Sequence, residues 1–156
     1  MKIWICAIGR LRAGPEADLI TDYLTRFDRT GRALGLGPVQ IVELDDRKGG
    51  GMAAEAELLR AAIPKGARIM VLDERGKTPT SPQFAETLAG WRDTDNRDLA
   101  ILIGGADGLA PDLRADADYA LSFGKMVWPH MLARVMLSEQ LYRAATILAG
   151  GPYHRS

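Results

Sequence analysis

The sequence predicts a single α/β domain, residues 1–156, in which helices flank a mainly parallel sheet. Short apolar runs alternate along the chain with longer segments whose apolar residues recur at helical spacing. The length suits one domain, and no linker or low-complexity segment divides it. The composition, 47% hydrophobic and 26% charged, is that of an ordinary globular protein.

The amino-terminal half is expected to alternate two strands with two helices. Each strand is a short run of apolar and β-branched residues. Pro15 suits the first turn of the first helix, because a proline there gives up no amide hydrogen that the helix needs. The expected elements are strands at 2–8 and 39–44 and helices at 15–29 and 52–63, with a polar loop at 45–51.

The carboxyl-terminal half continues the alternation. The run Leu99 to Ile103 is almost wholly apolar, so we expect a central strand covered on both faces. Ser81 and Pro82 suit an N-cap and a first helical residue. The expected elements are strands at 68–73, 99–103 and 119–123, helices at 81–91 and 111–117, and a final helix from Pro129 to about Ala149.

Two segments follow strands at the carboxyl edge of the sheet, where ligands of such sheets bind. Gly104 and Gly105 either let a ligand approach the backbone or form a plain tight turn. The segment Leu121 to Pro129 is too apolar for a surface connection, so it either walls a pocket or forms a hydrophobic staple before the last helix. Neither segment matches a P-loop or a dinucleotide-binding glycine motif.

The final helix and the tail are the other unusual features. Apolar residues cover most of the helix circumference, which predicts burial on two sides, the second against another subunit across a two-fold axis. Glu139 and Arg143 are four residues apart and are expected to pair. The tail, Pro152 to Arg155, carries residue types that stack on bases and contact phosphates, although such an end is often unstructured.

Charge and cysteine content limit the possible functions. The net charge is zero, yet residues 122–156 carry +3 and residues 93–118 carry −5. A chain with no net charge has little basic surface with which to bind free RNA, so the neutral total favours a partner that offers a preformed surface. The single Cys6 excludes an internal disulfide and is expected to be a buried strand residue. We expect no metal, no membrane segment and a cytoplasmic protein, because metal-ligand spacings and long apolar stretches are both missing.

Several motifs occur in a fixed order along the whole chain. They are Leu72-Asp73, Ile103-Gly104-Gly105-x-x-Gly108-Leu109, Pro129-His130-x-Leu132-x-Arg134, Glu139-x-Leu141-Tyr142-Arg143-Ala144 and Pro152-Tyr153-His154-Arg155. In this order and spacing the chain resembles the ribosomal RNA large subunit methyltransferase H family of SPOUT methyltransferases. The resemblance implies S-adenosylmethionine-dependent methylation of N3 of a pseudouridine in the helix 69 loop of 23S rRNA, on assembled ribosomes. It also implies a carboxyl-terminal trefoil knot and a homodimer whose site takes residues from both subunits.

The resemblance also assigns roles to residues. Trp128 is larger than the leucine common at its place, which affects the shape of the adenine pocket. The acidic Asp73 and Asp107 are expected to favour the positive sulfonium of the cofactor. The implied cofactor residues are Leu72, Gly104, Gly105, Phe123, Gly124, Lys125, Met126, Val127 and Trp128. The residues expected to hold and polarise the nucleotide are His130, Arg134, Arg143, Tyr153, His154 and Arg155.

Other functions stay open at this point. One is a methyltransferase of the same fold that acts on another RNA, such as tRNA. Another is a ribosome-associated factor without catalytic activity, which would not bind S-adenosylmethionine. A third is a general nucleotide binder, which would respond to ATP or NAD instead.

Overall fold

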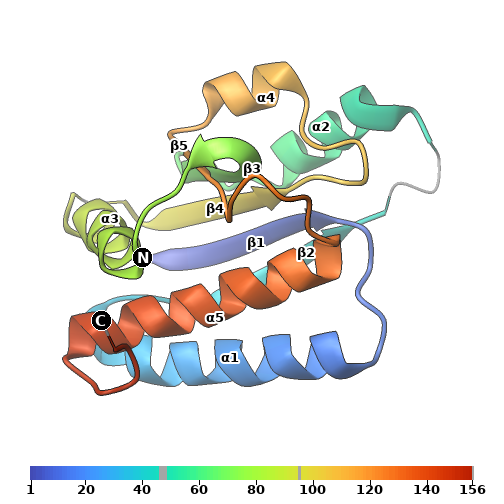
Figure 1. Ribbon diagram of the computed structural model, residues 1–156. Coiled ribbons are helices and arrows are strands. Elements are labelled where there is room, and N and C mark those ends of the chain that lie inside the picture. The colour runs from blue at the N-terminus through green and yellow to red at the C-terminus, as the bar shows by residue number, and fades with distance from the viewer. Residues whose placement is uncertain (46–48, 95, 156) are drawn as a thin grey trace.

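The computed structural model describes residues 1–45, 49–94 and 96–155 and contains one five-stranded parallel sheet (Figure 1). Hydrogen-bonded neighbours follow the order β2-β1-β4-β3-β5, and every pair is parallel. The expected α/β fold is therefore confirmed. The elements are β1 (Lys2–Ile8), α1 (Pro15–Gly31), the 3₁₀ helix η1 (Arg32–Leu34), β2 (Val39–Leu44), α2 (Gly51–Ala62), β3 (Arg68–Lys77), α3 (Ser81–Asp93), β4 (Asp98–Ile103), α4 (Pro111–Asp116), β5 (Tyr119–Leu121) and α5 (His130–Ala149).

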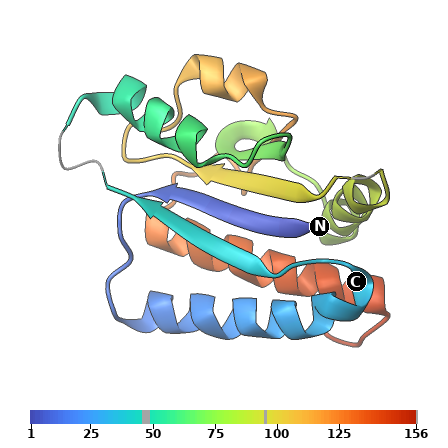
Figure 2. The same cartoon turned by 180° about the vertical axis from the view of Figure 1, so that it is seen from behind.

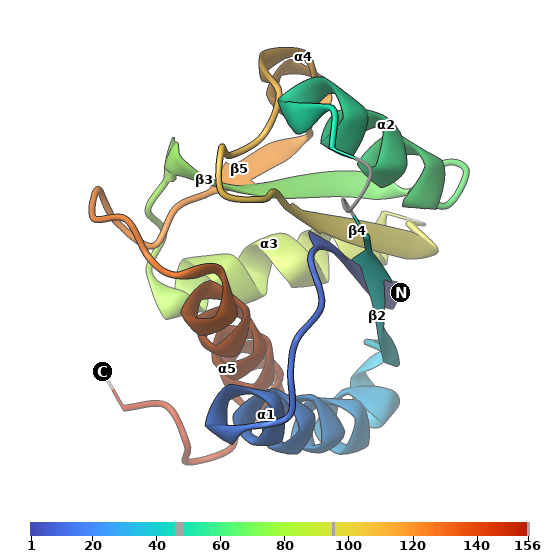
Figure 3. The same ribbon diagram turned by 90° about the vertical axis from the view of Figure 1, so that its right-hand side faces the viewer.

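Helices cover both faces of the sheet in three layers. Figures 1 and 3 show α1, α3 and α5 on one face and α2 and α4 on the other, while Figure 2 shows β2 at the sheet edge. The central strand β4 serves both cores, because Leu99 and Ile101 pack on the first face and Ala100 and Leu102 on the second. Each fully buried Leu or Ile side chain contributes about 1.5–3 kcal/mol to stability. The prediction that this strand is central and covered on both faces is confirmed.

Most expected boundaries are close, and three differ. Strand β3 continues to Lys77, past the expected loop, and its register with β5 shifts between Leu72 and Lys77. Strand β5 is correspondingly short and ends at Leu121. The N-cap of α3 is Thr80, whose hydroxyl accepts from the Gln83 amide in a capping box, so the expected cap one residue later is wrong. Part of the expected loop at 45–51, residues 46–48, lies outside the described residues.

Cys6 lies in the interior of the second core, as expected. Its side chain is fully buried, and this burial raises the pKa of the thiol to about 11. The thiol is therefore neutral at physiological pH and acts as a small apolar residue. In the described ranges, no helix is long and apolar enough to cross a membrane. The implied trefoil knot stays a prediction.

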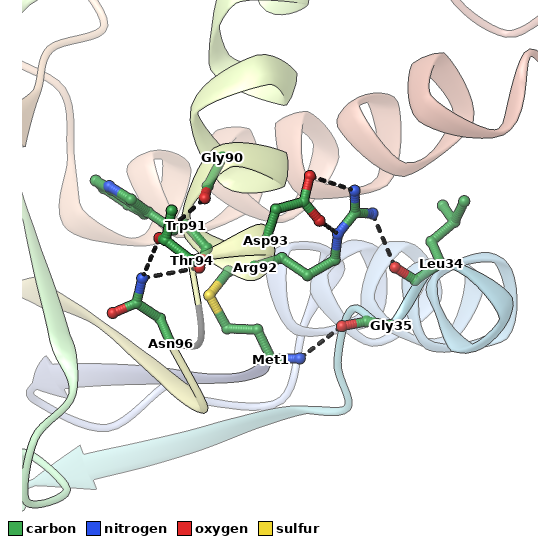
Figure 4. A network of polar contacts seen from close by, with 9 residues as sticks. All are labelled: Met1, Leu34, Gly35, Gly90, Trp91, Arg92, Asp93, Thr94 and Asn96. Atoms are coloured by element: carbon green, nitrogen blue, oxygen red, sulfur yellow. Dashed lines mark hydrogen bonds and ion pairs between the residues drawn. The ribbon is translucent and has the colours of Figure 1, made fainter.

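The amino terminus is tied to the end of η1, the 3₁₀ helix that directly follows α1 (Figure 4). The Met1 ammonium donates to the Gly35 carbonyl at 2.5 Å, and Arg92 of α3 donates to the Leu34 carbonyl at 2.8 Å. Gly35 takes the left-handed conformation that ends η1. Two cations thus meet carbonyls at a helix end, where the helix dipole is negative. These contacts join α1, α3 and β1 at the edge of the sheet where β1 begins, opposite the edge considered next.

Candidate functional site

A cleft of about 290 Å³ opens beside residues 72–75 of β3 and the carboxyl ends of β4 and β5, which are neighbours in the parallel sheet through β3. One wall is the loop after β4, in which the Gly108 amide donates to the Gly105 carbonyl at 3.0 Å. A Cβ atom on Gly104 would lie 2.9 Å from the carbonyl carbon and oxygen of Gly108, so the loop requires glycine there. The glycines therefore form a tight turn and also line a cleft. The two interpretations that the sequence left open, a turn and a place where a ligand can approach the backbone, are compatible here.

The opposite wall is the apolar segment between β5 and α5. The Ser122 hydroxyl accepts from the Gly124 amide at 3.0 Å and donates to the Glu74 carbonyl at 3.0 Å. These hydrogen bonds tie the segment to β3. Met126 and Val127 line the cleft and are still 76% and 84% exposed. The segment thus walls a pocket that is open to solvent. Eight of the nine expected cofactor residues line this cleft, all except Lys125, namely Leu72, Gly104, Gly105, Phe123, Gly124, Met126, Val127 and Trp128.

Charges in the cleft are partly balanced already. The Asp73 carboxylate lies 3.3 Å from Nη1 of Arg114 and 3.7 Å from Nε of Arg75, and it accepts from the Arg75 amide. Two guanidinium groups therefore offset its charge, and Asp73 has little left to attract a sulfonium. Asp107 also lines the cleft and is exposed. The expected attraction of a sulfonium stays a prediction for Asp107 alone.

The tail folds back on α5 and forms a second polar cluster. Oε1 of Glu139 accepts from Arg143 at 2.6 and 2.9 Å and from the Tyr153 hydroxyl at 3.1 Å. The expected pairing of Glu139 and Arg143 is confirmed. Nη1 of Arg143 lies 3.2 Å from Nδ1 of His154. Because a guanidinium only donates, Nδ1 accepts and the neutral ring carries its proton on Nε2. The tail is thus ordered by its own side chains.

Aromatic rings and a further cation surround this cluster, and sequence reasoning missed three of these residues. Tyr142 packs against Tyr153 with ring centroids 4.7 Å apart and against Tyr23 at 6.3 Å. The Arg26 guanidinium lies 5.9 Å from the Tyr142 ring centroid. Tyr23 and Arg26 come from α1, and only the packing of α1 on α5 brings them here (Figure 1). Their spacing of three residues, on one face of a helix, was the available signal.

The phenol of Tyr153 is expected to ionise at unusually high pH. Burial and the negative charge of Glu139 raise its pKa from 10.0 to about 12. A raised pKa means that the hydrogen bond to Glu139 stabilises the fold fully below pH 10 and that this contribution is lost between pH 10 and 12. The test is the ultraviolet absorbance of phenolate against pH, taken as wild type minus Tyr153→Phe. A difference curve centred on the usual tyrosine value would contradict the expectation.

The cleft and the tail cluster lie apart in one chain. Of the six residues expected to hold the nucleotide, only His130 lines the cleft. Arg143, Tyr153 and His154 form the tail cluster, while Arg155 is exposed beyond it. Glu139 is nine residues beyond His130 on α5, about 14 Å along the helix axis. Arg134 is in neither group, because it is 5% exposed and binds Glu43 and the Gly9 carbonyl.

An exposed apolar patch lies near the cleft. It joins the start of α1, the apolar segment before α5 and the first turn of α5, which share one end of the molecule in Figure 1. Large apolar side chains gathered on a surface usually mark an interaction site. The members of the patch are Leu19, Met126, Val127, Trp128, Met131 and Leu132, which are 37–84% exposed.

Known proteins resemble the chain along its whole length. The sequence model of a family described as predicted SPOUT methyltransferases matches residues 1–154. The chain is 73% identical over 155 residues to the ribosomal RNA large subunit methyltransferase H of Dinoroseobacter shibae, with 99% of each chain covered. It is 71% identical over 156 residues to the protein of that name from Roseobacter denitrificans, with 100% of each covered. TrmJ from Z. mobilis ZM4 superposes with a TM-score of 0.53 at 15% identity, over 99% of this chain and 73% of that one, which shows the fold alone.

Proposed function

Because the chain belongs to the SPOUT methyltransferase family, within it to the ribosomal RNA large subunit methyltransferase H family, we propose that it methylates ribosomal RNA of the large subunit. The donor is S-adenosylmethionine. The proposed target is N3 of a pseudouridine in the helix 69 loop of 23S rRNA, on assembled ribosomes. Two features of this chain support the proposal together, a glycine-walled cleft at the carboxyl edge of the sheet and an ordered tail cluster.

The cleft suits S-adenosylmethionine in size and chemistry. Its volume of about 290 Å³ is at the lower end for small-molecule sites. Gly104 brings backbone within reach of the ligand, and Phe123 and Trp128 offer apolar surface to an adenine ring. Asp107 offers a carboxylate to a positive charge. When bound, the cofactor supplies a methyl group on a positively charged sulfur.

The tail cluster has the chemistry to hold a nucleotide. Glu139 fixes the guanidinium of Arg143 and the hydroxyl of Tyr153, and Arg143 in turn orients the ring of His154. Nε2–H of His154 then points away from Arg143 as a hydrogen-bond donor, the group needed to polarise a base carbonyl. A ring in this state has no free nitrogen to take the N3 proton, so His154 positions the base and another acceptor removes that proton.

The separation of cleft and tail cluster supports a homodimer with shared sites. Methyl transfer needs the nucleotide and the methyl group in contact. The exposed apolar patch next to the cleft offers a face for a second copy, most simply across a two-fold axis. We therefore propose that the tail of one subunit completes the cleft of its partner.

Transfer of labelled methyl groups tests the proposed function. Incubation with ribosomes from a strain that lacks this methylation is expected to label the large-subunit rRNA. His154→Ala is expected to lose about 100-fold in rate, the usual scale for removing one hydrogen-bond donor that stabilises charge developing in the transition state. Its calorimetric affinity for S-adenosylmethionine is expected to stay unchanged, because His154 is assigned to the nucleotide and does not line the cofactor cleft of its own subunit.

Lys65→Ala, at the opposite edge of the sheet, is the control and is expected to keep full activity. Label in free tRNA would assign the chain to another RNA. Absence of both label and heat of cofactor binding would indicate a factor without catalytic activity. Full activity of His154→Ala would refute the assigned role of the tail.

A further inference from the structure

A buried ion pair holds the loop between β1 and α1 against α5. The Arg134 side chain is 6% exposed, and its Nη1 lies 2.7 Å from Oε2 of Glu43 at the end of β2. Nη2 of Arg134 donates to the carbonyls of Ile8 and Gly9 at 3.3 and 2.8 Å. The same Glu43 oxygen accepts from the Leu11 amide at 2.6 Å. One ion pair thus holds three backbone groups at the start of this loop.

The loop presents two arginines without acidic partners. Arg10 and Arg12 flank Leu11, whose side chain packs against the first core, and both arginines are exposed. Within the described residues, neither has an ion pair or a hydrogen bond from its side chain. Many other arginines of the chain are paired with carboxylates, namely those at 26, 60, 68, 75, 92, 114, 134 and 143.

The loop lies at the edge of the sheet that carries the cleft. It leaves the carboxyl end of β1, and β1 is hydrogen-bonded to β4, whose own carboxyl end leads into Gly104. Figure 3 shows the loop running from β1 to α1 past the first turns of α5. His130 at the start of α5 lines the cleft, and Arg134, one turn further on, holds the loop. Loop and cleft are therefore fixed to the same end of one helix.

We propose that Arg10 and Arg12 bind phosphates of the RNA backbone beside the methylated nucleotide and that the Arg134–Glu43 pair fixes their position. This inference rests on the proposed function and adds a second RNA contact to it. Arginine matches phosphate oxygens with paired N–H groups, and such contacts set the register of a nucleic acid without reading its sequence. Because the chain has no net charge, a fixed pair of free cations supplies attraction that the overall charge does not.

The test compares two double variants that remove the same charge. Arg10→Ala/Arg12→Ala is expected to raise the KM for ribosomes about tenfold and to leave kcat and calorimetric S-adenosylmethionine affinity unchanged. Its binding to assembled ribosomes, measured by co-sedimentation, is expected to depend less on salt, by about one to two units of the log–log slope. Lys65→Ala/Arg97→Ala, with both residues exposed at the opposite edge, is the control and is expected to match wild type.

The other outcomes separate a failure of the inference from a failure of the proposed function. Equal changes of KM and salt dependence in the two double variants would show a general attraction between charges. If Arg10→Ala/Arg12→Ala has the KM and salt dependence of wild type, the two arginines do not contact the RNA, and the proposed function is unaffected. A loss of subunit association in sedimentation velocity would place the loop against a second copy. If wild type binds assembled ribosomes without methylating them, the proposed function fails, and the salt dependence of binding still decides whether Arg10 and Arg12 contact RNA phosphates. If wild type does not bind them, both fail.

Discussion

A heterodimer of one subunit carrying Gly104→Val and one carrying His154→Ala is expected to show about half the methylation rate of the wild-type dimer, because one of its two shared sites is intact. Each homodimer is expected to be nearly inactive. Valine at position 104 places a side chain against the backbone of Gly108, so the loop that walls the cleft must shift, and we expect cofactor binding to be lost. Alanine at position 154 removes the ring that Arg143 orients.

The reason lies in the separation of the two groups. If a site combines the cleft of one subunit with the tail of the other, the two variant positions of the heterodimer fall together in one site and spare the second. If a site used the cleft and tail of the same chain, each subunit would carry one defect and no site would work. The heterodimer is obtained by co-expression with two different affinity tags, and the measurement is methyl transfer to ribosomes.

A matched control carries both substitutions in one subunit. Gly104→Val paired with the double variant Gly104→Val/His154→Ala has no intact cleft, so this heterodimer is expected to be inactive. Calorimetry separates the single defects, since only His154→Ala is expected to bind S-adenosylmethionine. Inactivity of the mixed single-variant heterodimer, with folded subunits and intact dimers, would refute the shared site.

Arg134→Met is expected to destabilise the protein by about 3 kcal/mol, the lower end of the cost of removing one partner of a buried ion pair. The lower end applies because the Glu43 side chain is 30% exposed and water partly solvates it once the partner is gone. The Ile8 and Gly9 carbonyls lose their donor as well. The measurement is the free energy of unfolding in urea.

Arg60→Met is the matched control, because the same substitution there removes only exposed ion pairs. Arg60 is 40% exposed and meets Asp112 and Asp116, which are 72% and 58% exposed. Exposed pairs of this kind stabilise a fold little, because water and salt screen the attraction. Equal losses of unfolding free energy in the two variants would show that the Arg134–Glu43 pair stabilises the fold no more than an exposed pair does.

The strands and the family motifs could be predicted from local sequence. The run Leu99 to Ile103 predicted a central strand because a strand buried on both faces must be apolar throughout. The ends of strands were harder to predict where pairing with a neighbouring strand decides them. Strand β3, for example, extends to Lys77 because Lys77 pairs with Leu121 of β5. Residue type alone does not locate the N-cap of α3, because Thr80 and Ser81 both suit that position. The folded chain decides it, since the Gln83 amide donates to the Thr80 hydroxyl.

Individual roles within the site were harder to predict. Arg134 belongs to the same family motif as His130, yet its side chain turns into the molecule to meet Glu43, a residue 91 positions away in the chain. Asp73 was expected to serve the cofactor, but Arg114 of α4 folds onto it. Tyr23 received no role because its partner Tyr142 lies on a distant helix.

The sequence by itself determined the alternation of strands and helices and the family, because these depend on residue types at fixed spacings along the chain. The tertiary structure alone decided which charged side chains are paired with an opposite charge and which face the solvent. Arg10 and Arg134 are alike in the sequence, but Arg10 is exposed and has no side-chain partner among the described residues, whereas Arg134 is buried in an ion pair. Electrostatic roles depend on distance and burial, and a chain acquires both only when it folds.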